Sequence, residues 1–406
     1  MTDGPVPVLW LCGPPGVGKS TVSWQLFTEL SQAGVNIAFA DTDQLHMCYP
    51  ARPEDPDREQ LKARNLGAMI RHYRAAGAKC VVLGGVLDPV LGVRRELMPG
   101  ADVTVVRLRA DPVEVMRRFI GRHGQREDPD GLLREVSDDV QHLDASDFAD
   151  ACIETTGIPA TRVARLVRDR CLDWPGFGAT IREQRAFSAE HAYPEAVDAD
   201  GHILLICGPT GVGKSTIAFR LYMQYLGADV TAGYVDLDQV GFLRPARPDD
   251  PGNHRLKARN LAAMWRNYHA AGATHLIAAG PVPSNKVFQT YIDAFPKATI
   301  TLCRLHASPV ELARRVMSRG DGGSWPQPGD PLRGQSEEYL RAVAYQALSA
   351  DRTFERARVG TVRIDTGGRT PEESAELIAA ATGWPSPGPS SSSVPGRAVG
   401  RVRLFK

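Results

Sequence analysis

Two short stretches of the chain combine glycine, lysine and serine in a pattern suited to polyphosphate chemistry. Residues 13–20 read Gly-Pro-Pro-Gly-Val-Gly-Lys-Ser, and residues 208–215 read Gly-Pro-Thr-Gly-Val-Gly-Lys-Ser. Both fit G-x-x-x-x-G-K-[ST], in which backbone N–H groups at a helix N-terminus wrap a chain of phosphates. Each stretch follows an apolar run of strand length and precedes a plausible helix, which argues against a chance glycine-rich turn. The pattern therefore predicts two nucleotide sites.

The residue types in this loop, the P-loop, give each position a role. The glycines leave room for phosphate oxygens where a Cβ would collide. The lysine is placed to reach the β- and γ-phosphates, and the serine hydroxyl offers a ligand to magnesium. The residues expected to bind ATP are Gly13, Gly16, Gly18, Lys19, Ser20, Thr21, Gly208, Gly211, Gly213, Lys214, Ser215 and Thr216.

A pair of aspartates follows the second predicted strand of each half: Asp41 and Asp43, then Asp236 and Asp238. In an open parallel sheet, ligands bind beyond the carboxyl ends of the strands. Two carboxylates beside bound ATP could hold the metal ion and position or deprotonate an attacking hydroxyl. The competing interpretation is an acidic turn that caps the next helix. The same Asp-x-Asp-Gln register in both halves favours the catalytic interpretation.

The two halves are interpreted as copies of one domain. Lys214 minus Lys19 is 195, and the same offset relates Asp236 to Asp41. In each half, continuously apolar strands alternate with helices, which predicts an α/β fold with a parallel sheet covered on both faces. We expect domain one over residues 1–172 (repeat one), a linker over 173–200, domain two over 201–384 (repeat two), and a disordered basic Pro/Ser-rich tail over 385–406.

The composition does not indicate a nucleic acid or a membrane as a bulk partner. The 48 basic and 47 acidic residues nearly balance, so no strong field favours nucleic acid or membrane as a bulk partner. The apolar runs are too short to span a membrane, and the N-terminus fits no secretory signal. The seven cysteines include no Cys-x-x-Cys pair, which favours a reducing compartment. We expect a cytoplasmic protein and leave its oligomeric state open.

These motifs together resemble a known group of enzymes. The P-loop, the Asp-x-Asp after strand two, Gly84-Gly85 in place of a Walker B acid, and a later helix with spaced arginines are similar to small-molecule kinases typified by shikimate kinase and gluconate kinase. Zeta toxins and chloramphenicol phosphotransferase are more distant relatives of the same shape. The resemblance covers nearly all of both halves. It implies two five-stranded parallel sheets of order 2-3-1-4-5, and transfer of the ATP γ-phosphoryl group to a hydroxyl of a small metabolite with Mg²⁺.

The resemblance also implies roles for the residues beyond the P-loop. Asp41 and Asp236, with the P-loop serines, would hold magnesium, and Asp43 and Asp238 would contact the acceptor hydroxyl and serve as base. The glycines beside the acceptor would be Gly85 and Gly280. The second half has Ala279-Gly280-Pro281 where the first has Gly84-Gly85-Val86, which argues against one substrate for both sites. The loops at 154–157 and 365–368 would approach adenine.

The same resemblance places arginines in a lid that closes over ATP and stabilises charge on the transferring group. These lid arginines are Arg118, Arg122, Arg315 and Arg319. The alternative for each of them is a solvated basic face.

The segment after the aspartates predicts the chemistry of the acceptor. Arg52 and Arg247 lie between proline-rich turns, and Arg64 and Arg259 lie on the following helix. Guanidinium groups bind carboxylate or phosphate through two hydrogen bonds, so we expect an anionic acceptor anchored first by Arg52 and Arg247. The nearby lysines 62 and 257 are interpreted as solubilising residues.

Two other functions stay open from the sequence. One is a regulatory NTPase that binds ATP without a small acceptor, and the other is a polynucleotide 5′-hydroxyl kinase. The Asp-x-Asp pair argues against the first, and the balanced charge argues against the second.

Overall fold

The computed structural model describes residues 4–123, 129–178, 196–225, 230–322, 330 and 332–384. The predicted tail over 385–406 and most of the predicted linker lie outside these residues. Within them, no helix has both the length and the apolar character needed to cross a membrane.

Each repeat alternates strands and helices. Repeat one, with the short helix that follows it, contains β1 (Val6–Cys12), α1 (Lys19–Gln32), β2 (Ile37–Asp41), the 3-10 helix η1 (Thr42–Gln44), β3 (Cys48–Tyr49), α2 (Glu59–Ala75), β4 (Cys80–Gly84), η2 (Arg95–Leu97), β5 (Ala101–Arg109), α3 (Pro112–His123), α4 (Pro129–Asp144), β6 (Ala151–Glu154), α5 (Ala160–Arg170) and α6 (Pro175–Gly178). Repeat two contains β7 (His202–Cys207), α7 (Lys214–Tyr225), β8 (Ala232–Asp236), β9 (Phe242–Arg244), α8 (His254–Ala270), β10 (His275–Ala279), α9 (Asn285–Ala294), β11 (Thr299–His306), α10 (Pro309–Gly320), α11 (Glu337–Arg356), β12 (Val362–Asp365) and α12 (Pro371–Thr382).

The parallel part of each sheet has the predicted order. In repeat one the strands lie in the order β6-β5-β1-β4-β2, and in repeat two in the order β12-β11-β7-β10-β8. Counted along the chain, both orders are 2-3-1-4-5. The central strand β1 pairs in parallel with β4 on one side and β5 on the other. This arrangement brings the loops after the first and second parallel strands to the same edge of each sheet.

The sequence did not predict the sixth strand of each sheet, which comes from the other repeat. β9 pairs antiparallel with β2, with Phe39 opposite Phe242, and β3 pairs antiparallel with β8, with Cys48 opposite Gly233. The two exchanged strands occupy matching places, because both follow the Asp-x-Asp turn of their own repeat. The segment between that turn and the next helix therefore adds a strand to the edge of the neighbouring repeat's sheet.

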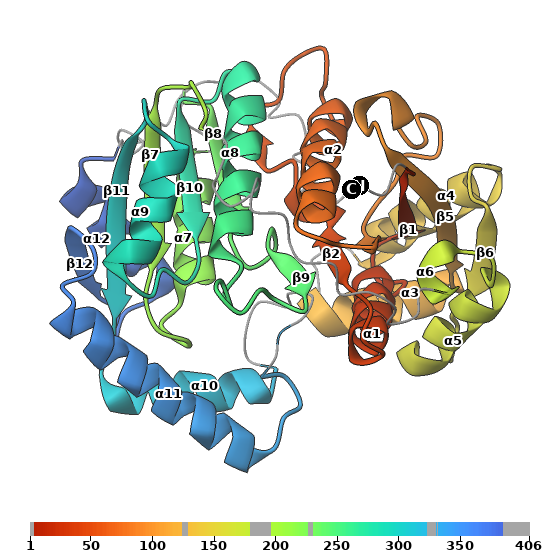
Figure 1. The fold of residues 1–406 in the computed structure, drawn as a ribbon. Helices are drawn as coiled ribbons and strands as arrows, with labels where there is room; N and C mark the ends of the chain where they lie inside the picture. The colour runs from red at the N-terminus through yellow and green to blue at the C-terminus, as the bar shows by residue number, and fades with distance from the viewer. Residues whose placement is uncertain are drawn as a thin grey trace.

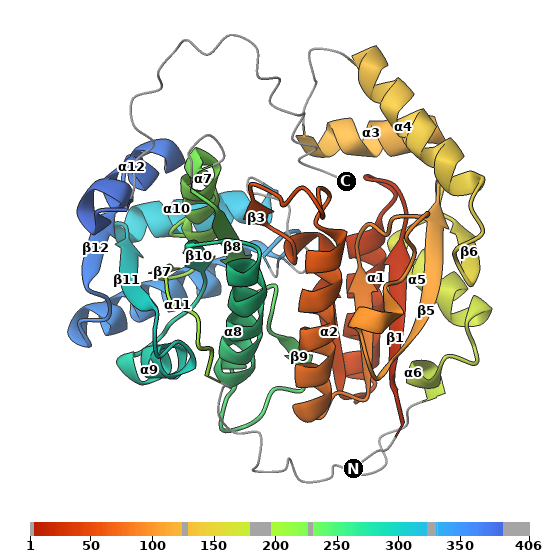
Figure 2. The same cartoon turned by 90° about the horizontal axis from the view of Figure 1, so that it is seen from above.

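The two repeats also share a helix contact and a core. Figures 1 and 2 show α2 and α8 side by side between the two sheets, with repeat one in red to yellow and repeat two in green to blue. The helices run antiparallel, since Asn65 of α2 meets Asn267 of α8 and His72 meets Asn260. One cluster of buried apolar residues contains members of both repeats, among them Trp265.

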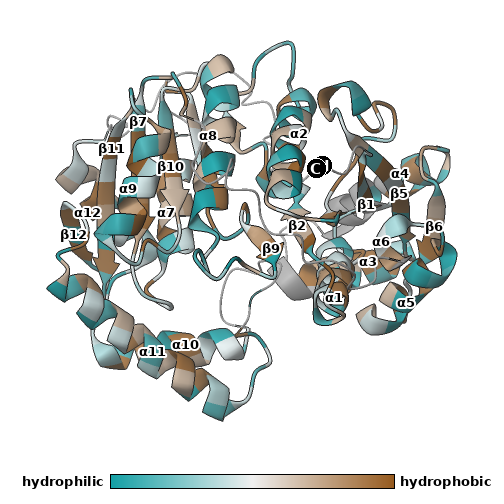
Figure 3. Ribbon diagram, in the orientation of Figure 1, coloured by the Kyte–Doolittle hydropathy of each residue, from teal (hydrophilic) through white to brown (hydrophobic). Residues whose placement is uncertain are grey.

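The pattern of apolar residues explains these layers. Every residue of β2 and of β4 is buried, as expected for strands covered on both faces. In Figure 3, β5 and β11 are largely brown, whereas helices such as α8 and α11 carry both brown and teal residues. These helices therefore bury an apolar face against the rest of the protein and carry polar residues on the other face.

Candidate active site

The first P-loop connects β1 to α1 and is packed too closely for side chains. A Cβ on Gly13 would lie 2.4 Å from the Leu108 carbonyl oxygen, and one on Gly16 would lie 2.7 Å from the Val115 carbonyl oxygen. α1 begins at Lys19, whose Nζ donates to the Pro14 carbonyl oxygen at 3.1 Å. The ammonium group thus folds back over the loop that would hold the phosphates. This cradle fits a polyphosphate bound by backbone N–H groups.

The second P-loop has the same geometry between β7 and α7. A Cβ on Gly208 would lie 2.5 Å from the Leu305 carbonyl oxygen. Lys214 Nζ donates to the Pro209 carbonyl oxygen at 3.0 Å. Burial lowers the pKa of Lys214, an effect that a bound phosphate would offset by adding negative charge. Both predicted loops therefore have the form that nucleotide binding requires.

Asp41 stands at the end of β2, directly beside the first P-loop. Ser20 Oγ donates to Asp41 Oδ2 at 3.1 Å, so a hydroxyl and a carboxylate meet where the sequence predicts magnesium. Burial, and then the neighbouring Asp43 carboxylate, raise the pKa of Asp41 to about 7. A buried carboxylate of this kind gains from a divalent cation, and oxygen donors are the ligands that Mg²⁺ prefers. The residues present fit the ion.

Asp43 is oriented by the strand next to β2. Its Oδ1 accepts a hydrogen bond of 2.8 Å from the Val86 N–H, and its own N–H donates to Asp41 Oδ1 at 3.0 Å. The close approach requires a glycine at position 85, because a Cβ there would lie 1.9 Å from Thr42 Oγ1 and 2.9 Å from Asp43 Oδ1. Gly85 thus lets the two loops touch, and it sets the position of the second aspartate.

In repeat two, Asp238 has a different partner. Its N–H donates to Asp236 Oδ1 at 2.9 Å, as in repeat one, but its own Oδ1 accepts from Lys257 Nζ at 2.8 Å. Desolvation raises the pKa of Asp238, and Lys257 and Lys214 outweigh it, so that the net pKa is below its ordinary value. Gly280 lies against the same turn, since a Cβ on it would be 2.5 Å from Leu237 Cβ.

The lysines 62 and 257 are not surface residues. Their side chains are 3% and 8% exposed, and both lie at the candidate site, so the interpretation as solubilising residues is wrong. Lys62 Nζ donates to Glu59 Oε1 at 2.7 Å and to the Val86 carbonyl oxygen at 3.0 Å. The helical pattern could have revealed their burial, because both fall on the apolar face beside Leu66 and Leu261.

Two predicted lid arginines form contacts with the protein. Arg118 of α3 donates to the Val17 carbonyl oxygen of the P-loop at 3.2 Å and to the Thr155 carbonyl oxygen at 2.9 Å, and it pairs with Glu114. Arg315 of α10 forms the same set of contacts in repeat two with Val212, Thr366 and Glu311. Each arginine joins the P-loop to the loop expected near adenine. A direct role in charge stabilisation stays a prediction for both.

The other two lid arginines differ in what the structure describes. Arg319 of α10 forms a 2.7 Å ion pair with Asp330, and its charge contributes to the lowered pKa of Lys214. It therefore lies within electrostatic reach of the second P-loop. The side chain of Arg122 lies outside the described residues.

The arginines expected to anchor the acceptor have partners of their own. Arg52 is half exposed, donates to the Ala270 carbonyl oxygen at the end of α8 at 3.1 Å, and pairs with Glu54. Arg247 Nε donates to Asp249 Oδ1 at 2.9 Å. The guanidinium groups of Arg52 and Arg247 therefore bind other acceptors of the protein. Neither of these contacts is with an aspartate of the Asp-x-Asp pairs.

The helical arginines of the same set differ from each other in burial. Arg64 is exposed on α2. Arg259 of α8 is half-buried and interacts with other residues. A role in acceptor binding stays a prediction for both.

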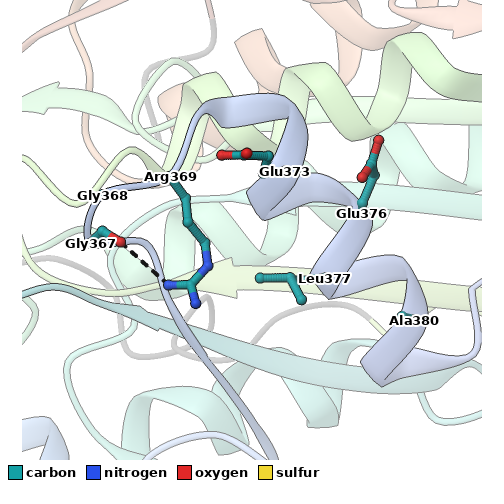
Figure 4. Close-up of a pocket in the computed structure, with 7 residues that line it drawn as sticks. All are labelled: Gly367, Gly368, Arg369, Glu373, Glu376, Leu377 and Ala380. Carbon is teal, nitrogen blue, oxygen red and sulfur yellow. Dashed lines mark hydrogen bonds between the residues drawn. The ribbon is translucent and has the colours of Figure 1, made fainter.

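A hollow of about 590 Å³ adjoins the loop expected near adenine in repeat two. It is lined by that loop and by the first turns of α12, including Glu373 and Leu377. Figure 4 shows Arg369 lying between the two, with a hydrogen bond to the Gly367 carbonyl oxygen.

Comparison with known proteins finds a family model that matches most of the first repeat. Residues 8–143 match the family model described as "AAA domain". Among solved structures, the chain is similar to shikimate kinase from Acinetobacter baumannii in complex with shikimate (22% identity, 41% of this chain and 94% of that chain, TM-score 0.29). It is also similar to a gluconokinase from Sinorhizobium meliloti 1021 (15%, 45% and 94%, 0.30) and to the tunicamycin resistance protein of Deinococcus radiodurans (20%, 45% and 96%, 0.32). No curated protein matches the chain. Residues 8–143 thus form a P-loop domain that matches the AAA domain family, and the second sheet repeats its strand order and its loop.

Proposed function

We propose that the chain is an ATP- and Mg²⁺-dependent phosphotransferase that moves the γ-phosphoryl group to a hydroxyl of a small acceptor. The observation that carries the proposal is the contact between Ser20 Oγ and Asp41 Oδ2 at 3.1 Å, with Asp43 held beside it by the Val86 N–H. A P-loop that only switches a partner needs one carboxylate near the metal. A second, separately oriented carboxylate is what a phosphoryl acceptor requires.

We call the site at the first P-loop site 1 and the site at the second P-loop site 2. Each residue of site 1 has a separate role in the proposed reaction. The backbone of the P-loop and Lys19 bind the phosphates, and Ser20 and Asp41 would hold Mg²⁺. When bound, the ion supplies positive charge that neutralises the phosphate oxygens. Asp43 orients the acceptor hydroxyl and takes its proton. Site 2 has the same groups. Lys214, Ser215, Asp236 and Asp238 correspond to Lys19, Ser20, Asp41 and Asp43.

Nucleotide stoichiometry tests the first half of this proposal. Calorimetry should find two ATP equivalents on the wild-type chain and one on Lys19→Ala or on Lys214→Ala, because each lysine serves one loop. The exposed Lys79→Ala is a matched control and should keep both equivalents. A wild-type stoichiometry of one would remove the claim of two sites.

Acceptor-dependent turnover tests the second half. ADP release with a panel of hydroxylated metabolites should exceed release with water alone for at least one acceptor. ATP binding without any acceptor-dependent release would favour a nucleotide-gated switch.

A further inference from the structure

The two sites differ at three positions that surround one shared lysine. With the offset of 195, Lys62 corresponds to Lys257. The positions that differ around it are Glu59 and His254, His46 and Gly241, and Val86 and Pro281. All three changes bear on where the lysine ammonium group can go.

In site 1 the lysine is directed away from the second aspartate. Lys62 Nζ contacts Glu59 Oε1 at 2.7 Å and the Val86 carbonyl oxygen at 3.0 Å. Asp43 instead accepts the Val86 N–H. Burial, and then the positive charge of Lys62, lower the pKa of His46 to about 3, so this imidazole lies within electrostatic reach of the same lysine. Site 1 therefore contains a carboxylate that already neutralises its lysine.

In site 2 each of these arrangements is replaced. Pro281 has no N–H to offer Asp238, and position 254 holds a histidine whose Nδ1 lies 3.1 Å from Tyr291 Oη. The absence of a side chain at Gly241 makes room for the aliphatic part of Lys257, because a Cβ there would lie 2.5 Å from both Lys257 Cγ and Cε. Lys257 Nζ consequently reaches Asp238 Oδ1 at 2.8 Å. The lysine is buried, whereas the Asp238 side chain is 51% exposed to the open site.

The charges of the two sites follow from these contacts. Site 1 has Glu59 to balance Lys62, so Lys62 does not need the Asp43 carboxylate. In site 2, Asp238 is the carboxylate that balances Lys257. A buried ammonium group that loses its carboxylate pays a large desolvation cost unless another anion replaces it. Pairing with Lys257 lowers the pKa of Asp238 and makes it a weaker base, and an acceptor that brings an anion for Lys257 relieves this effect.

We propose that Lys257 makes site 2 selective for an acceptor that carries both a hydroxyl and an anionic group, whereas Lys62, which is paired with Glu59, imposes no such requirement on site 1. This proposal rests on the phosphotransferase function above. The acceptor's carboxylate or phosphate pairs with Lys257, and Asp238 then accepts a hydrogen bond from the acceptor hydroxyl. In the transfer, the O–H bond breaks with its proton passing to Asp238, and the acceptor oxygen bonds to the γ-phosphorus. The bond from that phosphorus to the bridging oxygen breaks, and its electron pair leaves with ADP.

The test uses water as the acceptor, so that no metabolite has to be identified. ATP hydrolysis is measured in Lys19→Ala, which leaves site 2, and in Lys214→Ala, which leaves site 1. Acetate is the probe, because it can pair with Lys257 and has no hydroxyl to be phosphorylated. Acetamide is its uncharged match, and sodium chloride holds the ionic strength constant.

We expect acetate to raise hydrolysis by site 2 about tenfold, because release of Asp238 restores part of a general-base contribution of about 10²–10⁴. Acetamide should have no effect, and site 1 should respond to neither compound. In the site 2 background, Lys257→Met should raise the rate without acetate and abolish the response. Gly241→Ala is a milder second variant, since its Cβ must displace the lysine stem.

The reciprocal variant transfers the property. His46→Gly combined with Glu59→His in the site 1 background should give site 1 a response to acetate. An equal response of the two wild-type sites, no response in site 2, or a response retained in both Lys257→Met and Gly241→Ala would overturn the inference. Absence of ATP hydrolysis by site 2 in every variant would also overturn the inference, whereas the phosphotransferase function itself fails only if no hydroxylated acceptor raises ADP release above that with water.

Discussion

At the scale of single residues, the two carboxylates of site 1 are distinguished by their surroundings. Asp41 is buried and faces Ser20, whereas Asp43 is tied to the Val86 N–H at the edge of the site. A group that binds a metal ion and a group that takes a proton need different environments. Asp41 and Asp43 are only two residues apart in the sequence, yet their side chains lie in different surroundings. Separate substitutions should therefore have separate effects.

Asp43→Asn should reduce phosphoryl transfer while leaving ATP affinity nearly unchanged. The amide keeps the size of the side chain but cannot take the acceptor proton, and loss of a general base costs about 10²–10⁴ in rate. Single-turnover ADP formation in the Lys214→Ala background measures the rate, and calorimetry measures affinity. Turnover within a few-fold of the parent would show that Asp43 is not the base.

The pH dependence of magnesium binding should report on Asp41. Its pKa is raised to about 7 by burial and by Asp43, so below pH 7 the carboxyl carries a proton that Mg²⁺ must displace. The apparent Mg²⁺ affinity of site 1 should fall about tenfold per pH unit between pH 7 and pH 5, and level off above pH 7. Calorimetry of Mg²⁺–ATP in buffers of different ionisation enthalpy counts the protons released. Binding at pH 6 with no proton release would contradict the assignment.

Single residues also show what the sequence could reveal about the site. The P-loops and the aspartates were predicted because the chemistry fixes residue type and spacing over a few positions. The partners of Lys62 and Lys257 depend on three other segments, at positions 46, 59 and 86 and their counterparts. No local pattern joins those segments. Only the alignment of the two halves at the offset of 195 would have drawn attention to the differences.

At the scale of elements, the exchange of β3 and β9 ties each site to the other repeat. Strands of two and three residues that end before a proline have almost no periodicity to detect, so no pattern of residues indicated them. The five parallel strands of each half are longer and mostly apolar, and the order that the family resemblance implied for them is correct. The exchanged strands were harder to predict than the parallel strands for two reasons. They are shorter, and they pair with strands that are distant in the sequence.

Phe242→Ala should destabilise repeat one although the residue belongs to repeat two. The Phe242 ring lies 4.9 Å from that of Trp24 and 5.6 Å from that of Phe39. Truncating a phenylalanine in an apolar cluster costs about 3–5 kcal/mol when the residue is fully buried, and this one is partly exposed, so about 2–3 kcal/mol is expected. Denaturant unfolding followed by tryptophan fluorescence measures the loss. Phe242→Leu is the matched control and should retain most of the stability; equal stability of all three proteins would mean that β9 contributes nothing to repeat one.

At the scale of the whole molecule, we expect the two repeats to fold as one unit, because they share a core and exchange strands. A single buried cluster contains Val8 and Tyr73 of repeat one together with Leu205 and Trp265 of repeat two. Cutting the chain between the repeats would expose this cluster and remove an edge strand from both sheets. Residues 173–200 separate the two repeats along the sequence, but the buried cluster and the exchanged strands join the repeats in the structure.

Heating should therefore unfold the chain in one transition, with a calorimetric enthalpy close to the van't Hoff enthalpy. The sharper test uses the Lys214→Ala protein, in which ATP binds only site 1. At about 100 times the dissociation constant, ATP should stabilise the folded state by about 2.7 kcal/mol, because binding to the native state alone shifts the equilibrium by that amount. In a single unit the entire transition moves to higher temperature, including the unfolding of repeat two, which binds nothing. Scanning calorimetry with and without ATP measures the shift, and Lys19→Ala provides the reciprocal case. Two transitions, of which ATP moves only one, would show that the exchanged strands and the shared core leave the repeats independent.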